Sequence, residues 1–111
     1  MFRHIALFRW AEGVTTEQIA DVGEALYALP AVIPEIRSYR FGADVGLGEH
    51  NFDYAVVADF DGVEDFRTYR DNPDHRAVAR SVIGPLISDR AAVQFDAGER
   101  PDDPTAPVSG E

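Results

Sequence analysis

The strand-like segments of this sequence are apolar on both faces, and this limits what the chain can fold into. Residues 2–10 alternate with the period of a β-strand, yet Phe8 and Trp10 fall on one face and Ile5 and Leu7 on the other. A sheet of such strands needs cover on both sides, because an exposed apolar face would exceed the patch that a monomer tolerates. With 111 residues, the chain has room for one core and no second domain.

The next segments predict a helix followed by two strands. Thr15 and Gln18 have the spacing of a helix capping box, and apolar residues then recur at helical intervals until about Pro30. Residues 36–44 and 52–60 are predicted to be strands joined by a glycine-bearing loop. We expect these two strands to pair as an antiparallel hairpin.

The last part of the predicted domain holds two shorter helices and a closing strand. Apolar residues at helical spacing predict a helix over 63–69, and Asn72-Pro73 interrupts it with a favoured cap and a favoured first helical residue. A second helix follows, and a strand over 90–96 closes the domain. The resulting order is the βαββαβ pattern of an α+β, ferredoxin-like fold.

Helices would cover one face of this sheet, so we expect a second copy of the chain to cover the other. Two sheets stacked face to face would bury the open faces and enclose a cavity, which predicts a homodimeric α/β barrel that binds a small hydrophobic molecule. The alternative is a monomer whose tail covers the face. We place the folded domain at residues 1–97 and a disordered, acidic and proline-rich tail at residues 98–111.

Composition excludes several classes of function. Acidic residues number 20 and basic residues, all arginine, number 10, and the net charge of −10 would repel nucleic acid and anionic membrane surfaces. The sequence contains no lysine or cysteine, which excludes Schiff-base, thiol and disulfide chemistry. No apolar run is long enough to span a bilayer, so neither nucleic acid nor membrane is an expected partner and a cytoplasmic location is expected.

His75 and Tyr69 are the candidate catalytic residues. His75 would lie near the start of the second short helix, where the helix dipole disfavours the imidazolium and leaves a neutral base, although neighbouring aspartates act in the opposite direction. Tyr69 precedes it across the break and could hold a substrate oxygen. The other interpretation is that His75 only caps the helix and that Tyr69 packs in the core.

Three strand residues are further candidates for substrate contact. His4 and Phe8 share the aromatic face of the first strand, and Tyr54 lies in the third. The histidines lack the spacing of a metal site, and the glycine-bearing loop lacks the spacing of a dinucleotide site. We therefore expect no metal and no cofactor. No serine lies in a nucleophile-elbow motif, which leaves a hydrolase without its nucleophile.

Three stretches of the sequence are typical of a known family: the opening HIALFRW, the helix end LPAVIPEI and, above all, the YRDNPDH segment from Tyr69 to His75. With these stretches the chain resembles the Dabb family, the stress-responsive A/B barrel domain proteins of the dimeric α/β barrel superfamily. The Asn-Pro-Asp-His piece is the most recognisable signature of the family. The resemblance spans roughly residues 2–97 and implies a dimeric α+β barrel.

The resemblance also implies roles for individual residues. A plant polyketide cyclase of this family has histidine and tyrosine at the places of His75 and Tyr69, and its histidine is taken to start an intramolecular aldol condensation. By this resemblance His75 would be the base, Tyr69 its partner and His4 a pocket-lining group. Leu26 stands where the cyclase has a pocket tyrosine.

Three functions stay open at this point. The first is a Dabb protein that binds a small hydrophobic molecule without chemistry. The second is a cofactor-independent, polyketide cyclase-like lyase that acts on a polyketide-like ligand. The third is a cofactor-free monooxygenase that acts on a polycyclic phenol.

Overall fold

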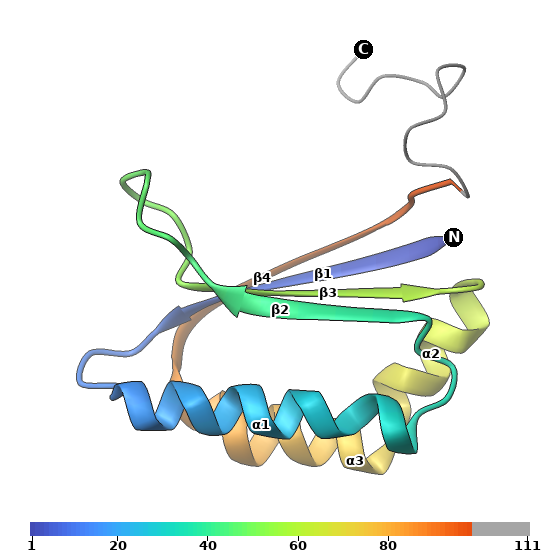
Figure 1. Cartoon of the computed structure of the whole chain (residues 1–111), viewed down its shortest axis with the longest axis horizontal. Coiled ribbons are helices and arrows are strands. Elements are labelled where there is room, and N and C mark those ends of the chain that lie inside the picture. Colours follow the sequence, from blue (N-terminus) through green and yellow to red (C-terminus); the bar gives the residue numbers. More distant parts are fainter. Residues whose placement is uncertain (99–111) are drawn as a thin grey trace.

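The computed structural model describes residues 1–98 and has the predicted α+β, ferredoxin-like fold. One antiparallel sheet has the strand order β2-β3-β1-β4. The strands are β1 (Phe2–Trp10), β2 (Ser38–Ala43), β3 (Tyr54–Phe60) and β4 (Ile87–Asp96). The long helix α1 (Thr16–Val32) and the shorter helices α2 (Val63–Asp71) and α3 (Pro73–Ala77) lie on the same side of this sheet (Figure 1). The predicted disordered tail lies, from residue 99 onward, outside the described residues.

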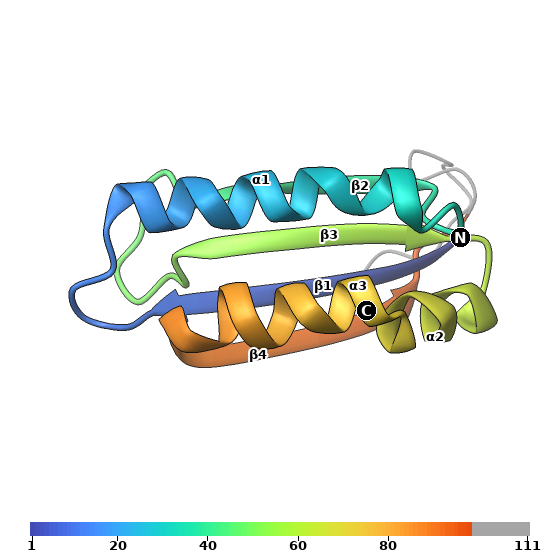
Figure 2. The same ribbon diagram turned by 90° about the horizontal axis from the view of Figure 1, so that it is seen from below.

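Even-numbered residues of β1 and β3 face the helices. Ala6 pairs with Val56 across the two strands, and both side chains are buried. His4 and Phe8, on the same side of β1, are buried as well. Seen from the helix side, α1 and α3 run along the sheet (Figure 2). The parity that the sequence left open is therefore settled, and the aromatic even-numbered residues belong to the helix-covered core.

Helix α1 begins at the predicted capping box and ends later than predicted. The Gln18 amide N–H donates to the Thr15 hydroxyl over 3.1 Å, and the Thr15 amide N–H donates to the Gln18 side-chain oxygen over 2.9 Å. The predicted end near Pro30 is wrong, because the helix continues to Val32. A proline in the last turn removes one backbone hydrogen bond, and burial of Leu29 and Ile33 on either side holds the turn in place.

The second predicted helix is built from three kinds of turn. After α3, the backbone widens into the π-helical segment η1 (Val78–Ile83) and then tightens into the 3-10 turn η2 (Gly84–Leu86). The Gly84 amide N–H donates to the Ala79 carbonyl, which closes the wide turn. A Cβ atom at position 84 would lie 3.0 Å from that carbonyl oxygen, so the turn favours glycine.

The predicted strands match the observed ones except at their ends. The strands β2 and β3 each begin two residues later than predicted, and β4 begins three residues earlier. The early start of β4 follows from pairing, since Ile87 lies opposite Trp10 across an irregularity in the ladder between Arg9 and Trp10. None of the helices in residues 1–98 has the length and apolar character that crossing a membrane requires.

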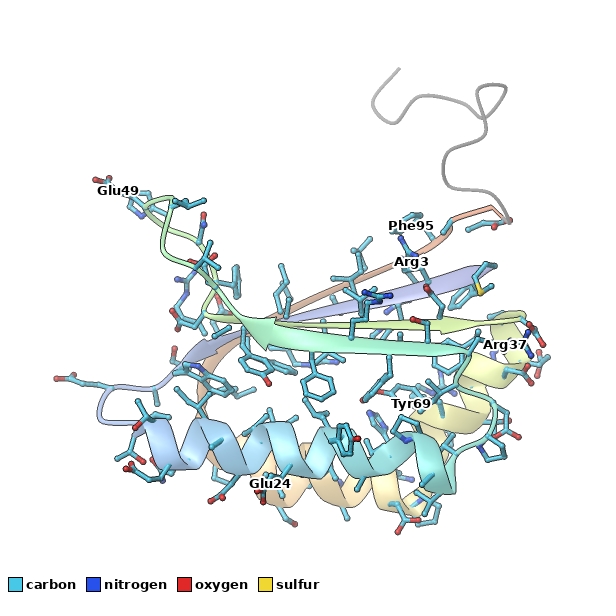
Figure 3. The ribbon with its side chains drawn as sticks, in the orientation of Figure 1. Arg3, Glu24, Arg37, Glu49, Tyr69 and Phe95 are labelled. Carbon is cyan, nitrogen blue, oxygen red and sulfur yellow. The ribbon has the colours of Figure 1, made fainter. Side chains whose placement is uncertain are left out.

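The other face of the sheet, here called the open face, has no helix over it among the described residues. Arg3 and Phe95 point to this side, whereas Tyr69 lies on the helix side (Figure 3). Its apolar side chains come from three strands and are Ile5, Leu7, Ala55, Val57, Ala91, Val93 and Phe95. Arg3 donates two hydrogen bonds to the Asp59 carboxylate, over 2.7 and 3.0 Å. The open face is thus an apolar patch that contains the Arg3–Asp59 pair, with Arg40, Arg9 and Asp89 on the same side of the sheet at its margins.

Candidate functional site

A cavity of about 120 Å³ lies between the sheet and the helices of a single chain. Its apolar wall consists of Ala6, Phe8, Leu26, Val56, Val78, Ala79, Ile83 and Ile87. Its polar lining consists of His4, Tyr39, Tyr69, His75 and Arg90. A cavity between two stacked sheets was predicted, whereas the structure has the cavity on the helix side of one sheet, where the short side chains of Ala6 and Ala79 leave space.

The break between α2 and α3 positions His75. The Asn72 side-chain oxygen accepts from the Asp74 amide over 2.8 Å and from the His75 amide over 3.4 Å, and Pro73 occupies the first turn. The predicted interruption and restart of the helix are therefore confirmed. The five-residue helix turns the His75 ring against the Tyr69 ring, with the ring centroids 4.0 Å apart.

The hydrogen bond of the His75 ring fixes where its lone pair lies. Nδ1 is 3.2 Å from the Arg70 carbonyl oxygen, which can only accept, so Nδ1 carries the proton and Nε2 the lone pair. Burial lowers the pKa of His75 below its ordinary value, Arg90 lowers it further, and the Arg70 carbonyl opposes both. Within residues 1–98 no side-chain nitrogen or oxygen is both buried and unpartnered, so Nε2 is accessible. A neutral imidazole with an accessible Nε2 can accept a proton.

Tyr69 forms a phenol pair that the sequence did not predict. Its hydroxyl oxygen lies 2.8 Å from that of Tyr39, and burial raises the pKa of both phenols, so both stay protonated at neutral pH. One of the two hydrogens makes the bond between them. The other hydroxyl hydrogen remains free, and because both tyrosines line the cavity it can be donated to an oxygen of a bound molecule.

His4 is a neutral, anchored group in the cavity wall. The side chain is buried, and burial followed by the charges of Arg90 and His75 lowers its pKa to about 4. The Gln94 amide nitrogen lies 2.8 Å from Nδ1 and donates to it, which leaves the hydrogen of His4 on Nε2. His4 is therefore suited to orienting a molecule rather than to taking a proton from it.

The remaining predicted substrate contacts divide between two places. Phe8 and Leu26 line the cavity with the catalytic candidates. Tyr54 is buried beside Trp10, with ring centroids 5.4 Å apart, and borders a separate, wide hollow of about 440 Å³ at the β2–β3 loop. That hollow lies away from the paired imidazole and phenols, so the smaller cavity is the candidate site.

Two polar residues of the cavity, Tyr39 and Arg90, were not predicted from the sequence. Tyr39 is on the helix side of β2, because it lies opposite Ala58, whose side chain is fully buried there. Arg90 lies opposite Phe8 and so shares the helix side. Placing either residue at the cavity requires knowing which alternate positions of its strand face the helices, and the sequence does not show this. Within the described part of the chain, no three histidine or acidic side chains gather as a metal site would need.

Comparison with solved structures gives two dimeric relatives. A dimeric ferredoxin-like protein of unknown function from Thermobifida fusca YX is 56% identical, with 85% of this chain and 88% of that chain covered and a TM-score of 0.79. A dimeric protein of unknown function and ferredoxin-like fold from Bacteroides fragilis is 30% identical, with 86% and 94% covered and a TM-score of 0.74. These relatives agree with the fold described above.

A more distant structure shares the fold alone. The hydroxynitrile lyase from Passiflora edulis is 22% identical, with 88% of this chain and 94% of that chain covered and a TM-score of 0.78. A comparison with curated proteins found no match. Residues 2–97 match the stress-responsive A/B barrel domain called Dabb, the family that the Asn-Pro-Asp-His signature indicated. This chain belongs to the Dabb family.

Proposed function

We propose that this protein binds a small, largely apolar molecule that carries an oxygen function, in the cavity between its sheet and its helices. The observation that carries the proposal is the pairing of Tyr39 with Tyr69 in an otherwise apolar wall, with one hydroxyl hydrogen left to donate. The apolar wall would take the body of the molecule, and the phenol pair would bind its oxygen.

The size of the cavity indicates the size of the ligand. About 120 Å³ is close to the ~150 Å³ of a protein cavity that binds benzene, and well below the ~300–1,000 Å³ of sites for larger ligands. This favours a single ring or a short aliphatic chain. A linear polyketide or a polycyclic phenol is larger, so the volume argues against the cyclase and monooxygenase alternatives.

Proton transfer by His75 is the second candidate function. It is favoured by one observation, the hydrogen bond from Nδ1 to the Arg70 carbonyl, which leaves Nε2 as a base beside the phenol pair. The structural neighbour from Passiflora edulis is named a hydroxynitrile lyase, so this fold is present in at least one lyase. The test is exchange of the methyl hydrogens of acetophenone in D₂O, followed by NMR. Wild type should exchange them faster than His75→Gln, and equal rates would exclude His75 as the base.

Binding itself is tested with benzyl alcohol, a one-ring molecule with one hydroxyl group. Titration followed by calorimetry and amide NMR should show saturable binding, with shifts clustered around His75 and Tyr69. The double variant Tyr39→Phe/Tyr69→Phe, which leaves no phenol hydrogen to donate, should weaken binding about fivefold, the effect of one hydrogen bond. The matched control is Tyr27→Phe, since Tyr27 is 81% exposed on α1 and loses the same hydroxyl away from the cavity. Absence of binding, or shifts elsewhere, would refute the proposal.

We also propose that two copies of the chain pair through their open faces. Val93 and Phe95 are 52% and 44% exposed in the single chain, at the end of a continuous apolar patch. Burial of such a patch stabilises a dimer. The relatives from Thermobifida fusca and Bacteroides fragilis are described as dimeric, which supports the same assembly here. The cavity is on the opposite side of the sheet and would stay accessible in this dimer.

A further inference from the structure

The charge in the cavity lining is one-sided. Of the residues in the described region that line the cavity, one is a permanent cation, Arg90, and none is Asp or Glu. This contrasts with the whole chain, in which acidic residues outnumber basic residues by 20 to 10. A cation beside an apolar cavity without a carboxylate partner attracts an anion from solution.

Arg90 differs from the other arginines of the described region in where it lies. Arg3, Arg37, Arg67 and Arg70 each form an ion pair with a carboxylate. Among residues 1–98 no ion pair is formed by the other five, Arg9, Arg40, Arg76, Arg80 and Arg90, and of these five only Arg90 lines the cavity. Asp89, the neighbour of Arg90 along β4, points to the open face, because successive side chains of a strand alternate between the two faces. Arg90 is an exposed residue that lines the cavity, so it lies at the mouth of the cavity rather than in its depth.

The position of Arg90 relative to the other polar groups fits a ligand with one charged end. Arg90 lies opposite Phe8 on the helix side of the sheet, so a dimer formed through the open faces would leave it free. Arg90 lines the same cavity as both histidines, and its charge lowers the pKa of each. The apolar wall continues inward from this point with Phe8 and Leu26.

We infer that Arg90 makes the cavity selective for small apolar carboxylates, with the carboxylate at the guanidinium and the apolar body inside. An arginine fork matches the two oxygens of a carboxylate and binds them through two parallel hydrogen bonds. This inference rests on the proposed function, since it assigns the chemical class of the ligand for the same cavity. Arg90 and the phenol pair line the same cavity and the charge of Arg90 acts on Tyr69, so a carboxylate at the guanidinium can also accept the free hydrogen of the phenol pair, with the apolar ring against the rest of the wall.

The test compares benzoate with benzamide, which has the same shape and no charge. Calorimetry with the full-length protein should give benzoate at least about tenfold higher affinity, the effect of a charge-assisted hydrogen bond over a neutral one. Raising the salt concentration should weaken benzoate binding several-fold and leave benzamide binding unchanged. This comparison uses the wild-type protein and does not depend on the folding of a variant.

Two variants locate the preference. Arg90→Gln should remove the preference for benzoate, and Arg80→Gln, which removes the same charge from an exposed position outside the cavity lining, should retain it. Equal affinities for benzoate and benzamide in wild type, or a preference that survives in Arg90→Gln, would overturn the role of Arg90 while ligand binding stands. If benzyl alcohol, benzamide and benzoate all fail to bind, the proposed function and this inference fall together.

Discussion

The two faces of the sheet differ in how they use their polar groups. On the helix side, His4, Tyr69 and His75 surround a cavity and keep hydrogen-bonding capacity for a further molecule. On the open face, Arg3 and Asp59 bind each other and leave an apolar patch around them. The comparison shows that one chain builds the candidate site alone, whereas the other face is suited to assembly.

The largest expected effect is loss of the dimer when a charge is introduced in the middle of the open face. Ile5→Asp places a carboxylate between Val57 and Val93 in the apolar patch of each copy, and an uncompensated buried charge costs ~3–5 kcal/mol. We expect the mass measured by light scattering to fall from two chains to one at micromolar concentration. The control is Val63→Asp, at a valine that is 42% exposed on α2 and should leave the dimer intact. An Ile5→Asp protein that stays dimeric on dilution would show that the open face is not the interface.

The helix side should respond to acid through His4. Its pKa is about 4 in the folded protein against an ordinary value of 6.5, so the unfolded chain binds more protons between these values. The free energy of unfolding should therefore fall as the pH falls from about 6.5 to about 4, by up to about 3 kcal/mol for this group. Urea unfolding at several pH values measures this.

Carboxylates also titrate in this pH range, so two variants in which asparagine replaces a histidine measure how much of the pH dependence of stability comes from His4. His4→Asn keeps an acceptor for Gln94 but cannot titrate, so its stability should depend less on pH than that of wild type. His50→Asn removes an exposed histidine from the β2–β3 loop and should follow wild type. Identical pH profiles for His4→Asn and wild type would contradict the assignment of the lowered pKa to His4.

Enlarging one alanine on each face of the sheet tests whether ligand binding and dimer formation are independent. Ala6→Leu adds bulk to the cavity wall and should weaken binding of benzyl alcohol at least about tenfold, with the dimer unchanged. Ala55→Leu adds the same bulk to the open face and should change the dimer dissociation constant, with binding unchanged. Calorimetry and light scattering give the two readouts. If both variants act on the same readout, the faces are not independent.

The smallest expected effect concerns the phenol pair. Tyr39→Phe removes the partner of the Tyr69 hydroxyl and should cost about 1 kcal/mol in the free energy of unfolding. Tyr27→Phe, at an exposed tyrosine, should stay within about 0.5 kcal/mol of wild type. Thermal and urea unfolding compare them. Equal stabilities would mean that the bond between the two phenols contributes nothing.

Periodicity and caps were sufficient to predict the order of elements. The capping box at Thr15 and the restart at Asn72-Pro73 are local features, and both are present as predicted. The helix end near Pro30 was wrong because burial of distant partners, which a local pattern does not contain, outweighs the proline. Local sequence therefore locates elements better than it locates their last turns.

The candidate site was only partly predictable for the same reason. His75 and Tyr69 lie six positions apart around a recognisable break, so their meeting could be proposed from the sequence. Tyr39 and Arg90 come from two strands that are remote in sequence, and their place at the cavity follows from sheet register. A chain that alternates large apolar residues on both strand faces does not reveal which side holds the helices.

The break at Asn72-Pro73 has a consequence for how natural sequences can diverge. In one uninterrupted helix, residues six apart would point about 240° apart and lie ~9 Å apart along the axis. The imidazole and the phenol of this protein touch because the chain stops and restarts between them. Insertions or deletions between positions 69 and 75 should therefore be rare in proteins that keep this pair. Substitutions at solvent-facing positions of the same segment should be common.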